Sequence, residues 1–172
     1  MPNTFELIAS STVGAGGAAS IDFTSIPSTF TDLCLKYAAR STGGTLDIVN
    51  KINFNSSTSG YSDRYLEGTG SATSSGANVY GGAAGFAGEA CGSTTTANTF
   101  SNVEIYIPNY AGSNNKSYSV DSVLENNATA TRQHLIAGLW SNSSAITSLS
   151  LVPNVGSFAQ YTTAYLYGVK NA

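Results

Sequence analysis

The sequence predicts an all-β protein, a jelly-roll-like, two-sheet antiparallel β-sandwich of eight to nine strands. Short runs of β-branched and aromatic residues recur between turns rich in Gly, Ser, Asn and Pro, and apolar and polar residues alternate within them. No window of about 12 residues combines apolar positions at the helical period with helix caps. Alternation implies one buried and one wet face per sheet, which favours two packed sheets. An immunoglobulin-like sandwich is the alternative, although it usually needs only about 100 residues.

Five strands are predicted in the first 70 residues, at 5–12, 19–23, 32–40, 46–54 and 61–68, the last a short edge strand. Because successive side chains point to opposite faces, Leu33, Leu35 and Tyr37 share one face of the third strand. In the fourth strand we expect the following residues to point inward: Leu46, Ile48, Ile52 and Phe54.

Strand signals resume in the second half of the chain, at residues 100–107, 116–125, 131–140, 145–152 and 163–169. Alternation assigns these groups to common faces: Val103, Ile105 and Ile107; Tyr118, Val120 and Leu124; Ala164 and Leu166. The strand at 131–140 is apolar on both faces, with Leu135, Ala137 and Leu139 on one and His134, Ile136 and Trp140 on the other.

Between these two sets of strands, residues 68–98 are rich in Gly, Ala, Ser and Thr, and they read as one long loop inserted into a single domain that spans residues 1–172. Its few anchoring side chains are Val79, Tyr80, Phe86 and Cys91. Loops of this length are functional, disordered or ordered by a partner. We expect the loop to form an arm that orders on a neighbouring subunit, with Phe86 as its anchor.

Composition excludes several classes of function. Charged residues make up 10% of the 172 residues and the net charge is −3, whereas an average soluble domain has roughly 25% charged residues. Seven Lys and Arg form no basic stripe for nucleic acid, and no stretch of roughly 20 apolar residues could span a membrane. The first residues lack the basic lead and apolar core of a signal peptide, so we expect production in a cytoplasm with Cys34 and Cys91 as free thiols.

Candidate catalytic residues are sparse. His134 is the only histidine, no Gly-x-Ser-x-Gly turn presents a nucleophile, and a structural or surface role is the expectation for this imidazole. Two carboxylate pairs, Asp121 with Glu125 and Asp63 with Glu67, read as solvated surface charges. The sequence therefore predicts a protein that is not an enzyme and that holds no metal or cofactor.

The ten tyrosines are the more informative feature. Six fall at predicted strand edges or in loops: Tyr61, Tyr65, Tyr80, Tyr106, Tyr110 and Tyr161. Tyr is enriched at protein interfaces and on sugar-binding surfaces, although it also simply favours strands. We select Tyr61, Tyr65, Tyr80 and Phe86 as candidate interface residues.

Several segments resemble a known family. They are residues 5–10 (FELIAS), 21–27 (IDFTSIP), 30–33 (FTDL), 104–110 (EIYIPNY), 138–141 (GLWS) and 165–169 (YLYGV). Together they resemble small structural proteins carried by the virions of tailed bacteriophages, over nearly the whole chain from Phe5 to Val169 apart from residues 68–98. The resemblance implies a β-sandwich, often a jelly roll, that assembles as an oligomer on the particle without catalysis or cofactor.

The expected function is therefore that of a capsid decoration (cement) protein. It would be made in the host cytoplasm and bind the outer capsid surface as a homo-oligomer, with a trimer favoured, in contact with the major capsid protein or another virion protein. The alternative is a tail-fibre or receptor-binding module that recognises host surface glycans through Tyr and Asn. A hydrolase of envelope polysaccharide is a third reading, for which the sequence offers no catalytic constellation.

Overall fold

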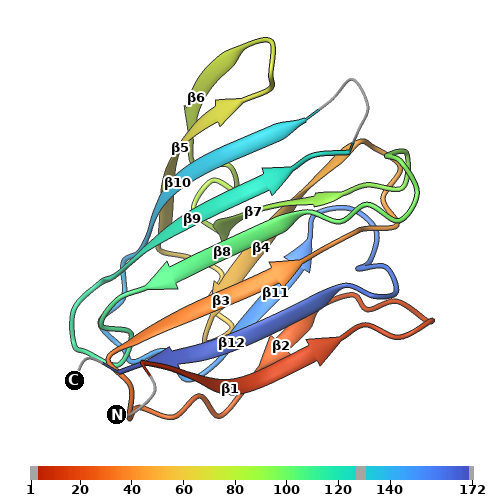
Figure 1. Cartoon of the computed structure of the whole chain (residues 1–172). Helices are drawn as coiled ribbons and strands as arrows, with labels where there is room; N and C mark the ends of the chain where they lie inside the picture. Colours follow the sequence, from red (N-terminus) through yellow and green to blue (C-terminus); the bar gives the residue numbers. More distant parts are fainter. Residues whose placement is uncertain (1–3, 127–130, 171–172) are drawn as a thin grey trace.

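The computed structural model describes residues 4–126 and 131–170, and within these ranges the chain forms twelve β-strands and no helix (Figure 1). The strands are β1 (Phe5–Thr12), β2 (Ile21–Phe23), β3 (Asp32–Ala38), β4 (Asp47–Phe54), β5 (Tyr61–Gly68), β6 (Thr73–Ala77), β7 (Gly85–Cys91), β8 (Asn102–Ile107), β9 (Lys116–Leu124), β10 (Arg132–Trp140), β11 (Leu149–Pro153) and β12 (Thr163–Val169). The all-β prediction is confirmed, whereas the predicted count of eight to nine strands is too low.

Two antiparallel sheets form a jelly-roll-like sandwich. The larger sheet has eight strands in the order β1-β12-β3-β8-β9-β10-β5-β6, and the smaller has four in the order β2-β11-β4-β7. In Figure 1 the larger sheet lies in front of β2, β11, β4 and β7. Its inner face packs on the smaller sheet, and its outer face is the surface turned towards the reader.

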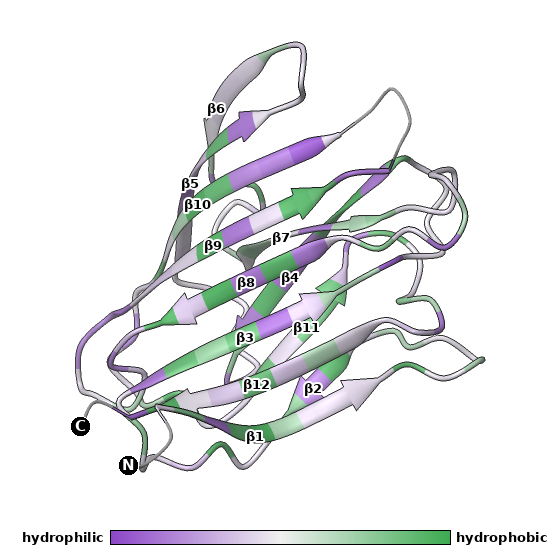
Figure 2. Ribbon diagram, in the orientation of Figure 1, coloured by the Kyte–Doolittle hydropathy of each residue, from purple (hydrophilic) through white to green (hydrophobic). Residues whose placement is uncertain are grey.

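Alternation places the predicted core residues correctly in most strands, as the banded colouring of β8 illustrates (Figure 2). The following predicted inward residues are all buried: Leu33, Leu35, Tyr37, Ile48, Ile52, Phe54, Val103, Ile105, Ile107, Tyr118, Val120, Leu124, Ala164 and Leu166. Leu46 is the exception, because β4 begins only at Asp47 and Leu46 lies in the preceding turn with 38% of its surface exposed.

Four aromatic side chains fill one end of the space between the sheets. Trp140 of β10 stacks on Tyr61 of β5 with ring centroids 6.2 Å apart, and Phe54 of β4 contacts both rings. Tyr118 of β9 lies edge-on to Phe54 and also covers Gly138 of β10, where any Cβ atom would come within 2.0 Å of the Tyr118 ring. Gly138 thus provides the space that Tyr118 occupies.

Residues 68–98 do not form the expected long loop, because they contain β6 and β7. All seven residues of β7 are buried, and β7 pairs with β4 while packing against β9 and β10 of the larger sheet. Its small residues permit this close approach: a Cβ atom at Gly85 would lie 2.3 Å from the Tyr118 hydroxyl. Gly and Ala here are therefore packing residues rather than signs of an unstructured arm.

The segment that follows β7 is also held by its own chain. The guanidinium of Arg40 donates hydrogen bonds to the hydroxyl of Thr95 and to the carbonyls of Ser93, Thr96 and Thr99. One half-buried cation thus orders the turns between β7 and β8. The insertion does not need a neighbouring subunit to become ordered.

Candidate functional site

Opposite the aromatic end, the same space between the sheets holds a group of charged side chains, which we name the polar cluster: Asp47, Glu67, Glu89, Arg132 and His134. Asp47 begins β4, Glu67 lies near the end of β5, and Arg132 and His134 begin β10. The antiparallel register pairs His134 directly with Glu67, and Arg132 lies two residues away on the same face of β10.

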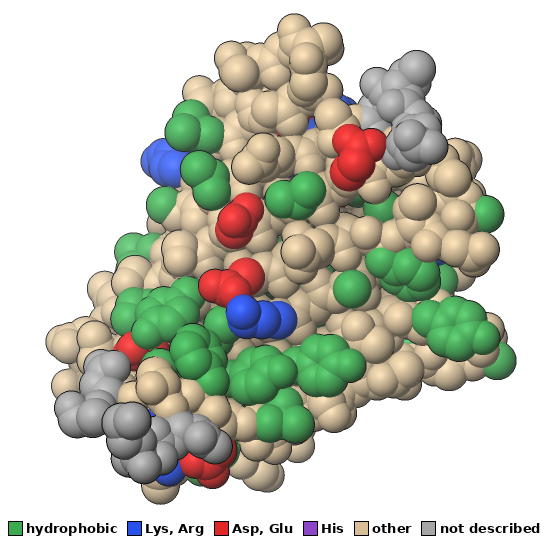
Figure 3. Space-filling model, in the orientation of Figure 1, with side chains coloured by type: hydrophobic (Ala, Val, Ile, Leu, Met, Phe, Trp, Pro, Cys, Tyr) green, Lys and Arg blue, Asp and Glu red, His purple; other side chains and the backbone are tan. Residues whose placement is uncertain are grey.

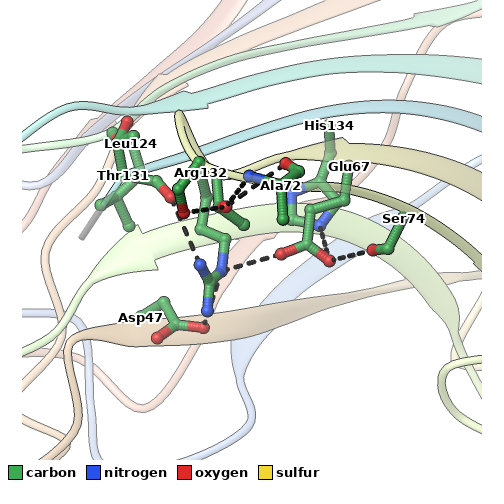
Figure 4. A network of polar contacts seen from close by, with 10 residues as sticks. Asp47, Glu67, Ala72, Ser74, Leu124, Thr131, Arg132 and His134 are labelled. Atoms are coloured by element: carbon green, nitrogen blue, oxygen red, sulfur yellow. Dashed lines mark hydrogen bonds and ion pairs between the residues drawn. The ribbon is translucent and has the colours of Figure 1, made fainter.

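Ion pairs of Arg132 connect carboxylates of the two sheets (Figure 4). Arg132 Nε lies 3.0 Å from Glu67 Oε1 and 3.7 Å from Asp47 Oδ2. His134 Nε2 lies 3.9 Å from the other Glu67 oxygen, which also accepts a hydrogen bond from the Ser74 hydroxyl at 3.0 Å. Arg132 therefore bridges the sheets, and Glu67 is the carboxylate around which the network is arranged.

Burial shifts two members of the cluster towards their neutral forms. Glu89 is 4% exposed, and desolvation, reinforced by the charge of Asp47, raises its pKa to about 8. Desolvation likewise lowers the pKa of His134, whose ring packs edge-on against Tyr65 and Phe86. In the described part of the chain, Glu89 Oε2 and His134 Nδ1 have no hydrogen-bond partner, and both residues line a cavity of about 180 Å³.

The cluster does not have the order of a nucleophilic triad. In such a triad the hydroxyl contacts the imidazole and the carboxylate supports the imidazole from its other side. Here the Ser74 hydroxyl donates to Glu67 instead. Among the described residues, no three His, Cys, Asp or Glu side chains gather closely enough to hold a metal ion.

Phe86, the predicted anchor of a surface arm, is a core residue. It is 2% exposed on β7 and packs edge-on against Tyr65 and His134. The reason is that β7, unforeseen from the sequence, carries this ring between the two sheets. Phe86 is therefore not an exposed anchor in this structure.

The three candidate tyrosines also lie against the interior to different degrees. Tyr61 is buried in the aromatic end, and its hydroxyl accepts a hydrogen bond from the backbone N–H of Phe54 at 2.7 Å. Tyr65 is half-buried against Phe86, and Tyr80 is half-buried with the Lys51 ammonium 5.1 Å from its ring centroid. The structure brings Tyr65 and Phe86 together, but it gathers no shared surface of all four candidates.

The other three tyrosines that the sequence places at strand edges or in loops differ in how far they are buried. Tyr110 is fully buried, and the Tyr106 hydroxyl donates a hydrogen bond to Asp32. Tyr161 is 67% exposed.

A groove on the outer face of the larger sheet was missed by the sequence analysis. It has a volume of about 670 Å³, and the two side chains on its floor, Leu66 of β5 and Leu135 of β10, are 62% and 55% exposed. We name it the β6 groove; its other outward-facing residues are Arg64, Ser75, Ala77, Ser119 and Ala137. Its only sequence signal is that residues 131–140 are apolar on both faces.

The opposite margin of the same face is also apolar. Phe5 and Leu7 of β1 are 49% and 53% exposed, and the Phe5 ring packs edge-on against Tyr167 of β12. Figure 3 shows hydrophobic side chains gathered over this margin, with few charged groups on the face as a whole.

The two carboxylate pairs of the sequence analysis are not alike. Asp63 is buried and accepts a hydrogen bond from the Val79 backbone N–H, so it is no surface charge, whereas Asp121 and Glu125 are exposed. Both cysteines are free and buried.

No helix among the described residues is long and apolar enough to cross a membrane. No known protein family matches this chain, and no curated protein is significantly similar to it.

Proposed function

We propose that this chain is a non-enzymatic virion structural protein, a decoration protein that binds the outer surface of a bacteriophage capsid as a homo-oligomer, with a trimer favoured. The observation that carries the proposal is the outer face of the larger sheet, where Phe5 and Leu7 on one margin and Leu66 and Leu135 on the other are about half exposed. Exposed apolar surface of this kind is typical of protein contact sites.

The edges of the larger sheet add a second argument. Among the residues that the structure describes, strands β1 and β6 end the sheet, and their outer edges offer unpaired backbone groups to another chain. Charged side chains are only 10% of the sequence, so copies brought side by side repel each other weakly. These features suit repeated contact with equivalent copies and with a larger surface.

Closed cyclic symmetry would cover the exposed Phe5 and Leu7 of every copy at once, because the same contact at the β1 margin repeats around the axis. The margin with Leu66 and Leu135 then stays free for a different partner. The face that remains would contact the major capsid protein or another virion protein.

The test is the location and copy number of the chain in purified particles, measured by quantitative mass spectrometry together with an electron microscopy reconstruction. A decoration protein is present in hundreds of copies on the head, and sedimentation of the free protein shows a trimer. A few copies at the tail would support the tail-fibre alternative instead. A protein that remains monomeric at high micromolar concentration would contradict the oligomer.

A further inference from the structure

The β6 groove lies beside the less protected edge of the larger sheet. Within the described residues, β6 pairs only with β5, so its second edge presents free backbone N–H and C=O groups. The strand reads Thr-Ser-Ser-Gly-Ala and has no charge and no proline, the two usual means of blocking strand addition.

The other edge of this sheet is better protected. Strand β1 has a register irregularity between Leu7 and Ala9, which interrupts regular pairing. Glu6 of β1 also forms an ion pair with Lys170 at 2.8 Å. An incoming strand therefore finds a regular, neutral edge at β6 and an irregular, charged one at β1.

The register determines what an added strand would meet on the outer face. Ser75 of β6 lies opposite Leu66, which lies opposite Leu135, so the two residues that follow Ser75 in this row are apolar. Ala77 lies opposite Arg64, so the adjacent row carries a cation. The two rows are two residues apart on one face, which is the spacing of alternate side chains in a strand.

The charge of Arg64 indicates which side chain an added strand would place in the second row, the row of Ala77 and Arg64. Arg64 is the one charged residue lining the β6 groove, and its guanidinium contacts neutral acceptors, the Asp63 carbonyl and the Asn78 side-chain oxygen. No carboxylate of the described residues lies within ion-pairing distance of it, whereas the Lys36, Arg132 and Lys170 side chains each have at least one. A carboxylate opposite Ala77 would complete this site.

We infer that the β6 edge and the β6 groove form a docking site for an extended peptide segment of a partner protein, which adds as a strand and carries an acidic and an aliphatic side chain two residues apart. Backbone pairing with β6 supplies affinity, and the rows at Arg64 and at Leu66 and Leu135 supply specificity. As the means of attachment to a larger particle, the site rests on the proposed function.

The experiment uses the full chain, labelled with ¹⁵N, and the probe peptide acetyl-Thr-Val-Asp-Thr-Leu-Thr-amide in an NMR titration. A second peptide with Lys in place of Asp is the charge control. We expect shifts in β6 (Thr73–Ala77) and at Leu66 and Leu135, and about tenfold tighter binding of the Asp peptide than of the Lys peptide.

Three surface variants make the result specific. Arg64→Glu reverses the preference between the two peptides, and Leu135→Asp weakens binding of the Asp peptide about tenfold. Val155→Asp, which changes a side chain of similar exposed fraction outside both sheets, leaves binding within about twofold. All three proteins are checked for unchanged unfolding midpoints.

The inference is overturned if the Asp peptide does not shift β6, if Arg64→Glu leaves its preference unchanged, or if an unlabelled second copy of the chain shifts β6 in place of the peptide. Its failure is separable from that of the proposed function. A chain that binds the peptide but is absent from particles contradicts only the function, and a chain abundant on the head that ignores the peptide contradicts only the docking site.

Discussion

The two ends of the space between the sheets are built on the same three strands and yet differ completely in chemistry. Strands β4, β5 and β10 contribute Phe54, Tyr61 and Trp140 at one end. At the other end the same strands contribute Asp47, Glu67, Arg132 and His134. The register that pairs Trp140 with Tyr61 also pairs His134 with Glu67, six residues away along both strands.

The difference shows how one strand can combine two kinds of packing. The aromatic end gains stability from apolar area removed from water and from ring contacts. The polar cluster must offset the desolvation of its charges with ion pairs, which it does only partly, because Glu89 Oε2 and His134 Nδ1 have no hydrogen-bond partner among the described residues. We therefore expect the aromatic end to dominate stability and the polar cluster to set its dependence on pH.

The largest effect should come from the aromatic end. Trp140→Ala removes a side chain that is 2% exposed and contacts Phe54 and Tyr61, so the free energy of unfolding should fall by about 4–5 kcal/mol. Urea unfolding followed by circular dichroism measures the loss. Tyr165→Ala, which truncates an aromatic residue that is 38% exposed, is the matched control and should change stability by less than about 1 kcal/mol. An equal effect of both variants would contradict the assignment of the core.

Phe86→Ala tests whether Phe86, which packs beside the polar cluster, is a core residue or a surface anchor. The ring is buried against Tyr65 and His134, so its removal should destabilise the fold by about 3–4 kcal/mol in the isolated protein. The same urea unfolding measurement applies. A variant as stable as the natural protein, with only its assembly on particles reduced, would restore Phe86 as a surface anchor.

Glu89→Gln should change how stability depends on pH. The folded pKa of about 8 lies above the ordinary value of 4.5, so the contribution of Glu89 is complete below about pH 4.5 and is lost as the pH rises through 8. The variant has no carboxylate at this position and lacks this loss. As the pH rises from 5 to 9, its free energy of unfolding should therefore increase by about 2–3 kcal/mol relative to that of the natural protein. Glu104→Gln, which changes an exposed carboxylate, is the control and should show no such trend. Parallel stability curves for all three proteins would contradict the buried state of Glu89.

His134→Gln should have the smallest effect, and its effect should appear at low pH, whereas that of Glu89→Gln appears at high pH. Desolvation and Arg132 lower the pKa of His134, against the opposing charges of Glu67 and Asp47, so the unfolded chain binds its proton more readily. The natural protein therefore loses stability as the pH falls below about 6.5. The variant should not show this loss, so at pH 5 its free energy of unfolding should have fallen by about 1 kcal/mol less than that of the natural protein. Thermal unfolding at pH 5 and pH 8 measures the difference. An identical decline in both proteins would show that the imidazole is not the titrating group.

Strands with clear alternation could be predicted from the sequence, and strands without it could not. The predicted bounds 5–12, 61–68 and 163–169 agree with β1, β5 and β12 to the residue. The expectation that 61–68 is an edge strand is wrong, because β6 pairs with β5 and takes the edge. Strand β7 was missed because Gly, Ala and Cys are buried on both of its faces, which leaves no period of two to detect. Strand β6 was missed because Ser, Thr and Gly are as common in turns as at an exposed edge.

The polar cluster could not be assembled from the sequence for a different reason. Glu67 and His134 are distant along the chain and meet only because β5 pairs with β10, and Glu89 joins them only through β7. Local patterns report which face a side chain occupies, but they do not report which strand lies beside it. The expectation that His134 is structural or at the surface nevertheless agrees with its burial among Tyr65 and Phe86.

The two cysteines provide a built-in means of following how the sandwich opens. Cys34 lies in β3 of the larger sheet and Cys91 in β7 of the smaller, and burial raises the pKa of both thiols, that of Cys34 to about 11. A thiol reagent such as maleimide can reach each one only when its surroundings unfold locally. Labelling rates at the two positions, read by peptide mass spectrometry, would therefore reveal whether the two layers separate together or one before the other.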